Sequence, residues 1–246
     1  METADCRLAV LIDADNAPRT ALREIMAECV KYGTPTVRRI YGDWTMNNMD
    51  SWKPLLLENA IIPVQQYSYT TGKNSTDSAM IIDAMDILHS HQVDGFVLVS
   101  SDSDFTRLAL RVREAGLKVY GIGEKKTPAP FIAACDKFIY VEVIRATGEK
   151  VEEKTFIPAH GRRRAIPDDI VRLIADTIQD VSDEDGWAFM GELGNILPKR
   201  RSDFDPRNYG FEKLTTMVKS IDRFEIDARP TSAPNVKHIY VRDRRA

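Results

Sequence analysis

Residues 93–107 read Val-Asp-Gly-Phe-Val-Leu-Val-Ser-Ser-Asp-Ser-Asp-Phe-Thr-Arg, and the fold can be inferred outward from them. The apolar run Phe96–Val99 predicts a short strand buried on both faces. Two serines follow, then Asp102 and Asp104, and a helical pattern resumes at Phe105. Both carboxylates therefore lie where a parallel strand passes into a helix, an edge at which open α/β sheets bind ligands. A role as helix N-cap would explain one of these two acids. The second acid is not needed for a cap, and it adds electrostatic repulsion.

Strand and helix patterns alternate on both sides of this stretch. Strands are predicted at residues 7–12, 36–41, 61–64, 96–99, 117–122 and 138–143, and helices at 18–30, 54–59, 76–88, 105–114 and 128–134. This alternation predicts an α/β fold, a three-layer and mainly parallel sheet with helices on its faces. We assign it to a first domain, residues 1–144.

The pattern changes after Val143. Residues 145–167 are rich in charge and contain glycine and proline, which predicts a linker. Helical patterns follow at 168–178, 187–197 and 211–221, and strand patterns at 224–226 and 236–241. Three helices and a terminal hairpin are typical of a winged helix. We therefore predict a small α+β domain over residues 168–246.

Composition narrows the class of protein. The 246 residues are 43% hydrophobic and 29% charged, as in soluble globular proteins. No apolar run approaches the roughly 20 residues of a membrane span, so we expect no membrane partner. Cys6, Cys29 and Cys135 are odd in number and lack metal-ligand spacing, which favours buried thiols in a reducing cytoplasm. The net charge of −3 does not by itself indicate that the protein binds nucleic acid.

Four aspartates form the candidate site. Asp13 ends the first predicted strand, and Asp102 and Asp104 follow the fourth, so the three converge if these strands are neighbours. Asp77 is the fourth candidate, although favourable charge at a helix N-terminus also explains it. Four acids in one pocket would raise one another's pKa unless a cation neutralised them. Mg²⁺ or Mn²⁺ is the fitting ion, and such a site activates water against a phosphodiester.

Three polar residues could support this site. Asn16 is either a helix N-cap or an amide that orients a phosphate or water. Asp83 is six residues after Asp77, about 120° around the helix, so it is expected to support the site without sharing the metal. Lys73 would contact a phosphate or be solvated.

Basic and aromatic residues suggest where a nucleic acid could bind. The cluster Lys199, Arg200 and Arg201 suits phosphate contacts, although a solvated face explains it equally well. Tyr67 and Tyr69, in a polar loop, are candidates for stacking an unpaired base. Three further aromatic residues are expected in the core of the second domain: Trp187, Phe189 and Phe211.

The first domain resembles the NYN family of PIN-like nucleases. The resemblance covers residues 7–143 and is carried by Val10-Leu-Ile-Asp-Ala-Asp-Asn16, Lys73-x-x-x-Asp77 with Asp83, Val99-Ser-Ser-Asp-Ser-Asp-Phe105, Val119-Tyr-Gly-Ile-Gly123 and Cys135-Asp-Lys-Phe-Ile139. It implies a PIN-like sheet in which the strands near Asp13 and Asp102 are adjacent. It also implies a ribonuclease site in which Mg²⁺ is held by Asp13, Asp77, Asp102 and Asp104, with Asn16 and Ser101 beside it. The family often has Gly where this chain has Ser101.

The second domain resembles the OST-HTH, or LOTUS, domain over about residues 168–243. The resemblance rests on Gly186-Trp187-Ala188, Leu193-Gly194, Asp205-Pro-Arg-Asn-Tyr-Gly-Phe211 and Leu214 before Phe224-Glu225. It implies RNA as a partner. The winged helix could also bind another protein, and the chain could form a homo-oligomer. The sequence does not decide either point.

Three functions compete. The first is a metal-dependent endoribonuclease with an RNA-binding winged helix. The second is a non-catalytic RNA-binding regulator that keeps the fold. The third is a phosphatase in which Asp13 is the nucleophile and Asp15 the acid, although Asn16-Ala17 stands where Gly-Thr is usual.

Overall fold

The structure is a computed structural model that describes residues 6–67, 75–152, 166–230 and 237–245. It divides into two compact units, residues 1–155 and 156–246, and each is described here by itself. None of the helices within the described residues has the length and apolar character that crossing a bilayer requires.

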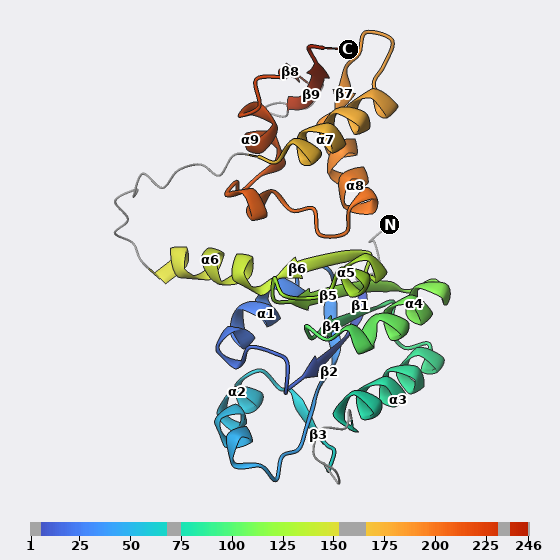
Figure 1. Cartoon of the computed structure of the whole chain (residues 1–246), viewed down its shortest axis with the longest axis vertical. Helices are drawn as coiled ribbons and strands as arrows, with labels where there is room; N and C mark the ends of the chain where they lie inside the picture. The colour runs from blue at the N-terminus through green and yellow to red at the C-terminus, as the bar shows by residue number, and fades with distance from the viewer. Residues whose placement is uncertain (1–5, 68–74, 153–165, 231–236, 246) are drawn as a thin grey trace. The chain divides into compact units, whose positions relative to one another are not determined.

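A six-stranded sheet forms the centre of the first unit (Figure 1). Its strands are β1 (Arg7–Asp13), β2 (Thr34–Gly42), β3 (Ile62–Gln65), β4 (Gly95–Val99), β5 (Lys118–Gly123) and β6 (Lys137–Tyr140). They lie in the order β3-β2-β1-β4-β5-β6, and every neighbouring pair is parallel. This confirms the predicted mainly parallel sheet and its adjacent first and fourth strands.

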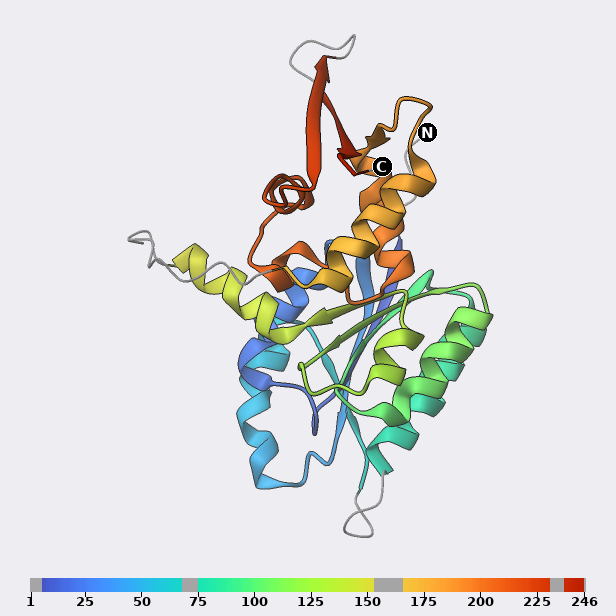
Figure 2. The ribbon, with the colours of Figure 1, turned by 45° about the horizontal axis from the view of Figure 1, so that its top comes forward.

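Helices cover both faces of this sheet, which gives the three predicted layers (Figure 2). One face carries α1 (Leu22–Cys29), α2 (Lys53–Glu58) and α6 (Val141–Glu152), and the other carries α3 (Ser75–Ser90), α4 (Thr106–Glu114) and α5 (Ala129–Ala134). Short 3₁₀ helices precede α1, α2 and α4: η1 (Arg19–Ala21), η2 (Asn47–Trp52) and η3 (Ser103–Phe105). Because side chains alternate along a strand, Val10 packs toward α1 and Leu11 toward α3 and α4. Both are buried, as a central parallel strand requires.

The strand order places the site. From β1 the chain adds β2 and then β3 on one side of the sheet. From β4 it adds β5 and then β6 on the other side. The reversal therefore falls between β1 and β4, where Ile12 pairs with Val99. At such a switch point the loops after the two strands diverge to opposite faces and leave a crevice at their carboxyl ends.

The end of the first unit differs from the expectation. A strand was predicted at 138–143, but β6 ends at Tyr140 and α6 begins at Val141. The β-branched sequence Val-Glu-Val-Ile favours a strand locally. Burial decides otherwise, since Val141 and Ile144, three residues apart, both pack into the core on the α1 face. The helix runs to Glu152 and so occupies the first part of the segment that was expected to be a linker.

The second unit has the predicted winged-helix composition. Its elements are α7 (Asp168–Val181), β7 (Ala188–Phe189), α8 (Met190–Arg200), η4 (Pro206–Tyr209), α9 (Leu214–Lys219), β8 (Phe224–Pro230) and β9 (Lys237–Asp243). The strands form an antiparallel sheet in the order β7-β9-β8. Ile170, Ile174 and Ile178 give α7 a buried stripe that packs with Leu193 and Leu197 of α8.

Two aromatic residues expected in this core lie outside it. Phe189 is 38% exposed and Trp187 is half-buried, whereas Phe211 does pack against the core. A helix was predicted from residue 187, but β7 precedes α8. The two-residue period of an extended segment turns Ala188 inward, and therefore turns Trp187 and Phe189 outward.

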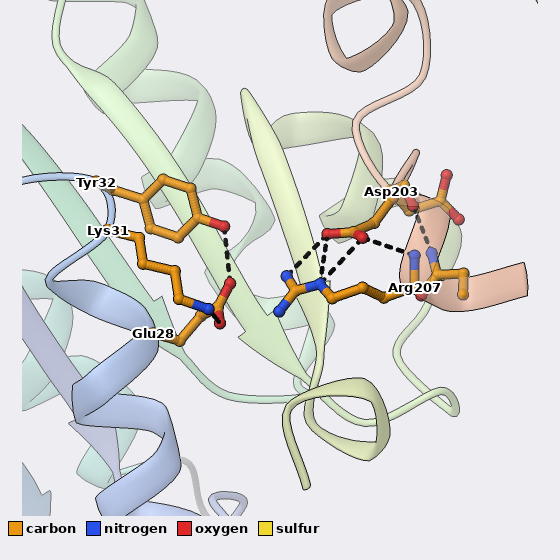
Figure 3. A network of polar contacts seen from close by, with 7 residues as sticks. Glu28, Lys31, Tyr32, Asp203 and Arg207 are labelled. Carbon is orange, nitrogen blue, oxygen red and sulfur yellow. Dashed lines mark hydrogen bonds and ion pairs between the residues drawn. The ribbon is translucent and has the colours of Figure 1, made fainter. Parts of the chain in front are cut away.

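Two buried acids away from the sheet's carboxyl edge, Glu28 and Asp205, have polar partners. On α1, Glu28 is 2% exposed and accepts hydrogen bonds from Lys31 Nζ at 2.6 Å and Tyr32 Oη at 3.0 Å (Figure 3). In the second unit, the Asp205 carboxylate accepts from Arg207 Nε at 3.0 Å and Nη2 at 2.8 Å. Such partners are needed because an unpaired buried charge is costly.

Candidate active site

Three carboxylates meet at the switch point. Asp77, Asp102 and Asp104 each offer one oxygen, and these oxygens all lie within 4.8 Å of one another. Asp77 comes from the first turn of α3, while the other two come from the connection between β4 and α4. The fold thus brings together residues that are separated in the chain by most of α3 and the whole of β4.

Local hydrogen bonds hold the loop after β4. Ser100 Oγ accepts from the backbone N–H of Asp102 at 3.1 Å, and the Asp102 carboxylate accepts from the N–H of Asp104 at 2.9 Å. Asp102 is therefore the N-cap of η3, the ordinary role that its sequence position suggested. The cap bond engages one oxygen of Asp102 and fixes the direction of its carboxylate, which also belongs to the acidic group.

Asp13 lies beside this group but is bonded differently. It is fully buried at the end of β1, and Oδ2 accepts from Ser100 Oγ at 2.8 Å and Asn16 Nδ2 at 2.9 Å. Oδ1 accepts from the N–H groups of Asp15 at 3.0 Å and Asn16 at 3.3 Å. Both oxygens are thus engaged by the protein. Asp13 ties the loop after β1 to the end of β4 and adds its charge to the crevice.

The charges in the crevice act on one another. Burial raises the pKa of Asp77 to about 6, and the negative charges of Asp13, Asp102, Asp104 and Asp15 add to that rise. Burial also raises the pKa of Asp13, against hydrogen bonds from Asn16 and Ser100 that lower it. Within the described part of the chain, no salt bridge reaches Asp77 or Asp102.

The chemistry of these donors fits a hard divalent cation. Carboxylate oxygens are the ligands that Mg²⁺ and Mn²⁺ prefer. Three of them converge here, and among the residues that the structure describes no imidazole or thiolate joins the group. A divalent ion would also offset the repulsion that raises the pKa of Asp77. The donor set therefore fits the expected metal, with Asp13 outside the convergent group.

The remaining candidates lie at varying distances from this centre. Ser101 is buried, and its Oγ accepts from the N–H of Glu124 at 2.9 Å, which joins the ends of β4 and β5. Asp83 forms an ion pair with Arg39 and accepts a hydrogen bond from Tyr41 Oη, so it connects α3 to β2. Lys73 and Tyr69 lie outside the described residues, and Tyr67 is exposed.

The basic cluster Lys199, Arg200 and Arg201 lies at the C-terminal end of α8, and two of its side chains form ion pairs. Arg200 pairs with Asp180, and Arg201 pairs with Asp169 at 2.7 Å and Asp203 at 3.0 Å. Lys199 is exposed. Surface pairs of this kind contribute only about 0–1 kcal/mol each, so a phosphate could compete for these side chains.

Ser100 is the site residue that the sequence interpretation passed over in favour of Ser101. Its hydroxyl contacts both Asp13 and the Asp102 backbone. The strand register was the missing signal. Ile12 pairs with Val99, so the next positions along the two strands place Asp13 opposite Ser100, while Ser101 turns the other way.

These features define an α/β protein with an acidic centre at its topological switch point, joined to a winged helix. Comparison with family models matches residues 7–142 to the NYN domain, and the chain belongs to that family. Residues 164–236 match the OST-HTH/LOTUS domain. Both expected resemblances are thereby confirmed. NYN domains are generally nucleases, and OST-HTH/LOTUS domains are RNA-binding.

Solved structures are similar to parts of the chain. A protein of unknown function from Vibrio parahaemolyticus, VPA0982, is 18% identical with a TM-score of 0.49, over 57% of this chain and 95% of that one. An uncharacterised protein from Nitrosomonas europaea is 31% identical with a TM-score of 0.30, over 38% and 91%. A fragment from Chromobacterium violaceum is 25% identical with a TM-score of 0.26, over 36% and 90%. A comparison with curated proteins found no match.

Proposed function

We propose that this protein is a metal-dependent ribonuclease. Its NYN unit would hydrolyse RNA phosphodiester bonds within the strand, and its OST-HTH unit would bind the RNA. The observation that carries the proposal is the convergence of Asp77, Asp102 and Asp104 within 4.8 Å of one another at the switch point. Membership of a family of nucleases, together with an RNA-binding domain in the same chain, supports RNA as the substrate.

The aspartates of the site would have two different roles, metal binding and positioning of the loops. Asp77, Asp102 and Asp104 would hold Mg²⁺ or Mn²⁺, and the bound ion supplies an activated water and stabilises charge on the phosphoryl oxygens. Asp13 acts as a positioning residue, because its bonds to Ser100 and Asn16 fix the two loops that frame the crevice. The raised pKa of Asp77 means that metal binding near pH 6 would release a proton.

The phosphatase alternative fits less well. A phosphoryl group could reach a nucleophilic Asp13 only if the side chain were accessible, but Asp13 is fully buried. Both of its oxygens already accept hydrogen bonds from Asp15, Asn16 and Ser100. A non-catalytic RNA-binding protein would keep this fold and differ only in turnover.

Cleavage of labelled RNA by Asp104→Asn tests the proposal. Asp104 is exposed, so the change removes a metal ligand without disturbing the core. We expect Mg²⁺- or Mn²⁺-dependent cleavage by the wild type and a loss of at least about 100-fold in the variant, since a metal supplies several kcal/mol of transition-state stabilisation. Asp86→Asn, an exposed change on α3 outside the acidic group, is the matched control and should cleave normally.

Binding of the metal itself is a second readout. Mn²⁺ titrated into the protein should bind the wild type and Asp86→Asn alike, and bind Asp104→Asn more weakly. Equal cleavage by Asp104→Asn and the wild type would refute the assignment of the site. Absence of metal-dependent cleavage by the wild type across single-stranded and duplex RNA would favour the non-catalytic alternative.

A further inference from the structure

The outer face of the three-stranded sheet in the winged helix carries an unusual set of side chains. The register pairs Phe189 with Tyr240, Arg229 with His238, and Glu225 with Arg242. Because side chains alternate, Ala188, Val241 and Ile226 face the core. We call the opposite side the outer sheet face and define it by Trp187, Phe189, Arg229, His238, Tyr240 and Arg242. The same register places Glu225 and Asp227 on this side.

Two arginines on this face lie against aromatic rings. The guanidinium carbon of Arg229 is 4.3 Å from the ring centre of Tyr240 and 5.2 Å from that of Trp187. The guanidinium of Arg242 is 4.7 Å from the ring centre of Trp187. These distances are in the range of cation–π contacts. Trp187 therefore contacts both arginines, which accounts for its position outside the core.

Ion pairs restrain both guanidinium groups. Arg229 Nε lies 3.0 Å from an Asp227 oxygen, and Arg242 Nη2 lies 2.8 Å from a Glu225 oxygen. Each arginine is thus engaged by a carboxylate and by a ring. A guanidinium fixed in this way presents a flat, weakly hydrated surface, on which a planar group can stack at little cost in side-chain entropy.

Phe189 extends the same face. It is 38% exposed, with its ring centre 5.1 Å from that of His238 and 5.7 Å from that of Tyr240. Its ring is tilted by 51° and 53° to theirs, so it is not buried in a stack with them. An exposed phenylalanine gains little for the stability of the fold.

The charge of this hairpin favours a polyanion. Residues 223–245 contain six basic and three acidic side chains, in a chain whose net charge is −3. Lys237, Arg244 and Arg245 are exposed at the ends of β9. A flat arginine–aromatic surface bordered by basic side chains combines the two components of single-strand recognition, stacking on bases and contact with phosphates.

We propose that the outer sheet face binds a single-stranded segment of RNA by stacking unpaired bases on Phe189 and on the arginines held against Trp187 and Tyr240. The identity of the ligand rests on the proposed function, and the position of the surface rests on the contacts above. A duplex keeps its bases stacked inside, so it cannot use this surface in the same way.

The test uses the full chain with Asp104→Asn in EDTA, so that binding is measured whether or not the wild type cleaves RNA. The probe is a single strand of about 12 nucleotides with 2-aminopurine at its centre, a length within the usual range of such sites. Its competitor is an abasic strand of equal length and charge. We expect quenching of 2-aminopurine and about tenfold tighter binding of the strand with bases, from one or two stacking contacts.

Two variants separate stacking from charge. Arg229→Lys with Arg242→Lys keeps both charges but removes the planar groups, so it should abolish most of the quenching and leave the salt dependence of binding unchanged. Phe189→Ser changes an exposed side chain and should reduce quenching without affecting folding, which circular dichroism would verify. The control, Lys213→Ala with Lys219→Ala, removes two exposed charges from the region of α9 and should leave quenching intact.

Equal affinity for the abasic strand or for a duplex would overturn the proposal, as would unchanged quenching in both variants. These outcomes concern binding in EDTA alone. They are therefore distinguishable from a failure of the nuclease assignment, which is measured as metal-dependent cleavage by the wild type.

Discussion

Asp77→Asn should stabilise the metal-free NYN unit while removing its response to metal. Asp77 is 8% exposed, and burial and the neighbouring carboxylates raise its pKa from 3.8 to about 6. A raised carboxyl pKa means that the folded state disfavours the charged form. The contribution of Asp77 to stability is therefore most favourable below its unfolded pKa and is lost as the pH rises through about 6.

The size of the effect follows from this shift. About 2 pKa units correspond to roughly 3 kcal/mol, since each unit is worth about 1.4 kcal/mol. Solvent screening reduces this figure, and the substitution also forfeits about 0.3–1 kcal/mol of favourable interaction with the N-terminus of α3. The repulsion between Asp77 and the neighbouring carboxylates, together with its burial, still outweighs the favourable interaction of Asp77 with the N-terminus of α3. We expect a gain of about 1–2 kcal/mol at about pH 8 in EDTA, or a rise of about 2–8 °C in Tm.

Urea unfolding followed by tryptophan fluorescence measures this change. Trp187 lies in the other unit, so a Trp187→Phe background leaves Trp44 and Trp52 as reporters of the NYN unit. The gain should shrink at about pH 5, where Asp77 is protonated. Saturating Mn²⁺ should reverse the order, because ligand at about 100 times its Kd stabilises the wild type by about 2.7 kcal/mol.

The reasoning would be refuted if Asp77→Asn were less stable than the wild type in EDTA at about pH 8, or if the difference did not change with pH. Asp86→Asn controls for the loss of an acid from α3 and should show neither the gain nor its pH dependence.

Three further substitutions test hydrogen bonding and packing inside each unit. Ser100→Ala removes a 2.8 Å hydrogen bond to buried Asp13 and should cost about 1–3 kcal/mol in urea unfolding of the NYN unit. Gly121→Ala would place a Cβ 2.5 Å from the Phe138 ring and should cost about 1–3 kcal/mol, seen as a lower Tm. Gly194→Ala, in α8, meets its nearest neighbouring atom at 3.9 Å and should stabilise the winged helix by about 0.5–1 kcal/mol, measured by thermal melting of the second unit. A destabilised Gly194→Ala, or Ser100→Ala and Gly121→Ala variants as stable as the wild type, would contradict these assignments.

Local periodicity was sufficient to predict the alternating strands and helices. It was also sufficient to predict which residues follow the strands at the carboxyl edge of the sheet. The apolar run Phe96–Val99 predicted a strand that is buried on both faces, and β4 has that character. Asp102 and Asp104 could be placed at its end because a strand-to-helix transition is a short-range feature. Local pattern failed where burial overrode propensity, as at Val141 in α6 and at Trp187 before β7.

Which carboxylates converge was decided by the strand order and by the direction of each side chain. Residue spacing in the chain does not distinguish Asp13, whose oxygens are engaged by Ser100 and Asn16, from Asp77, which joins Asp102 and Asp104. The partnership of Arg229 with Trp187 and Tyr240 likewise requires strands paired across the sheet. Periodicity is a property of neighbouring residues and is therefore written in the sequence, whereas register and side-chain direction between distant segments arise only when the core packs.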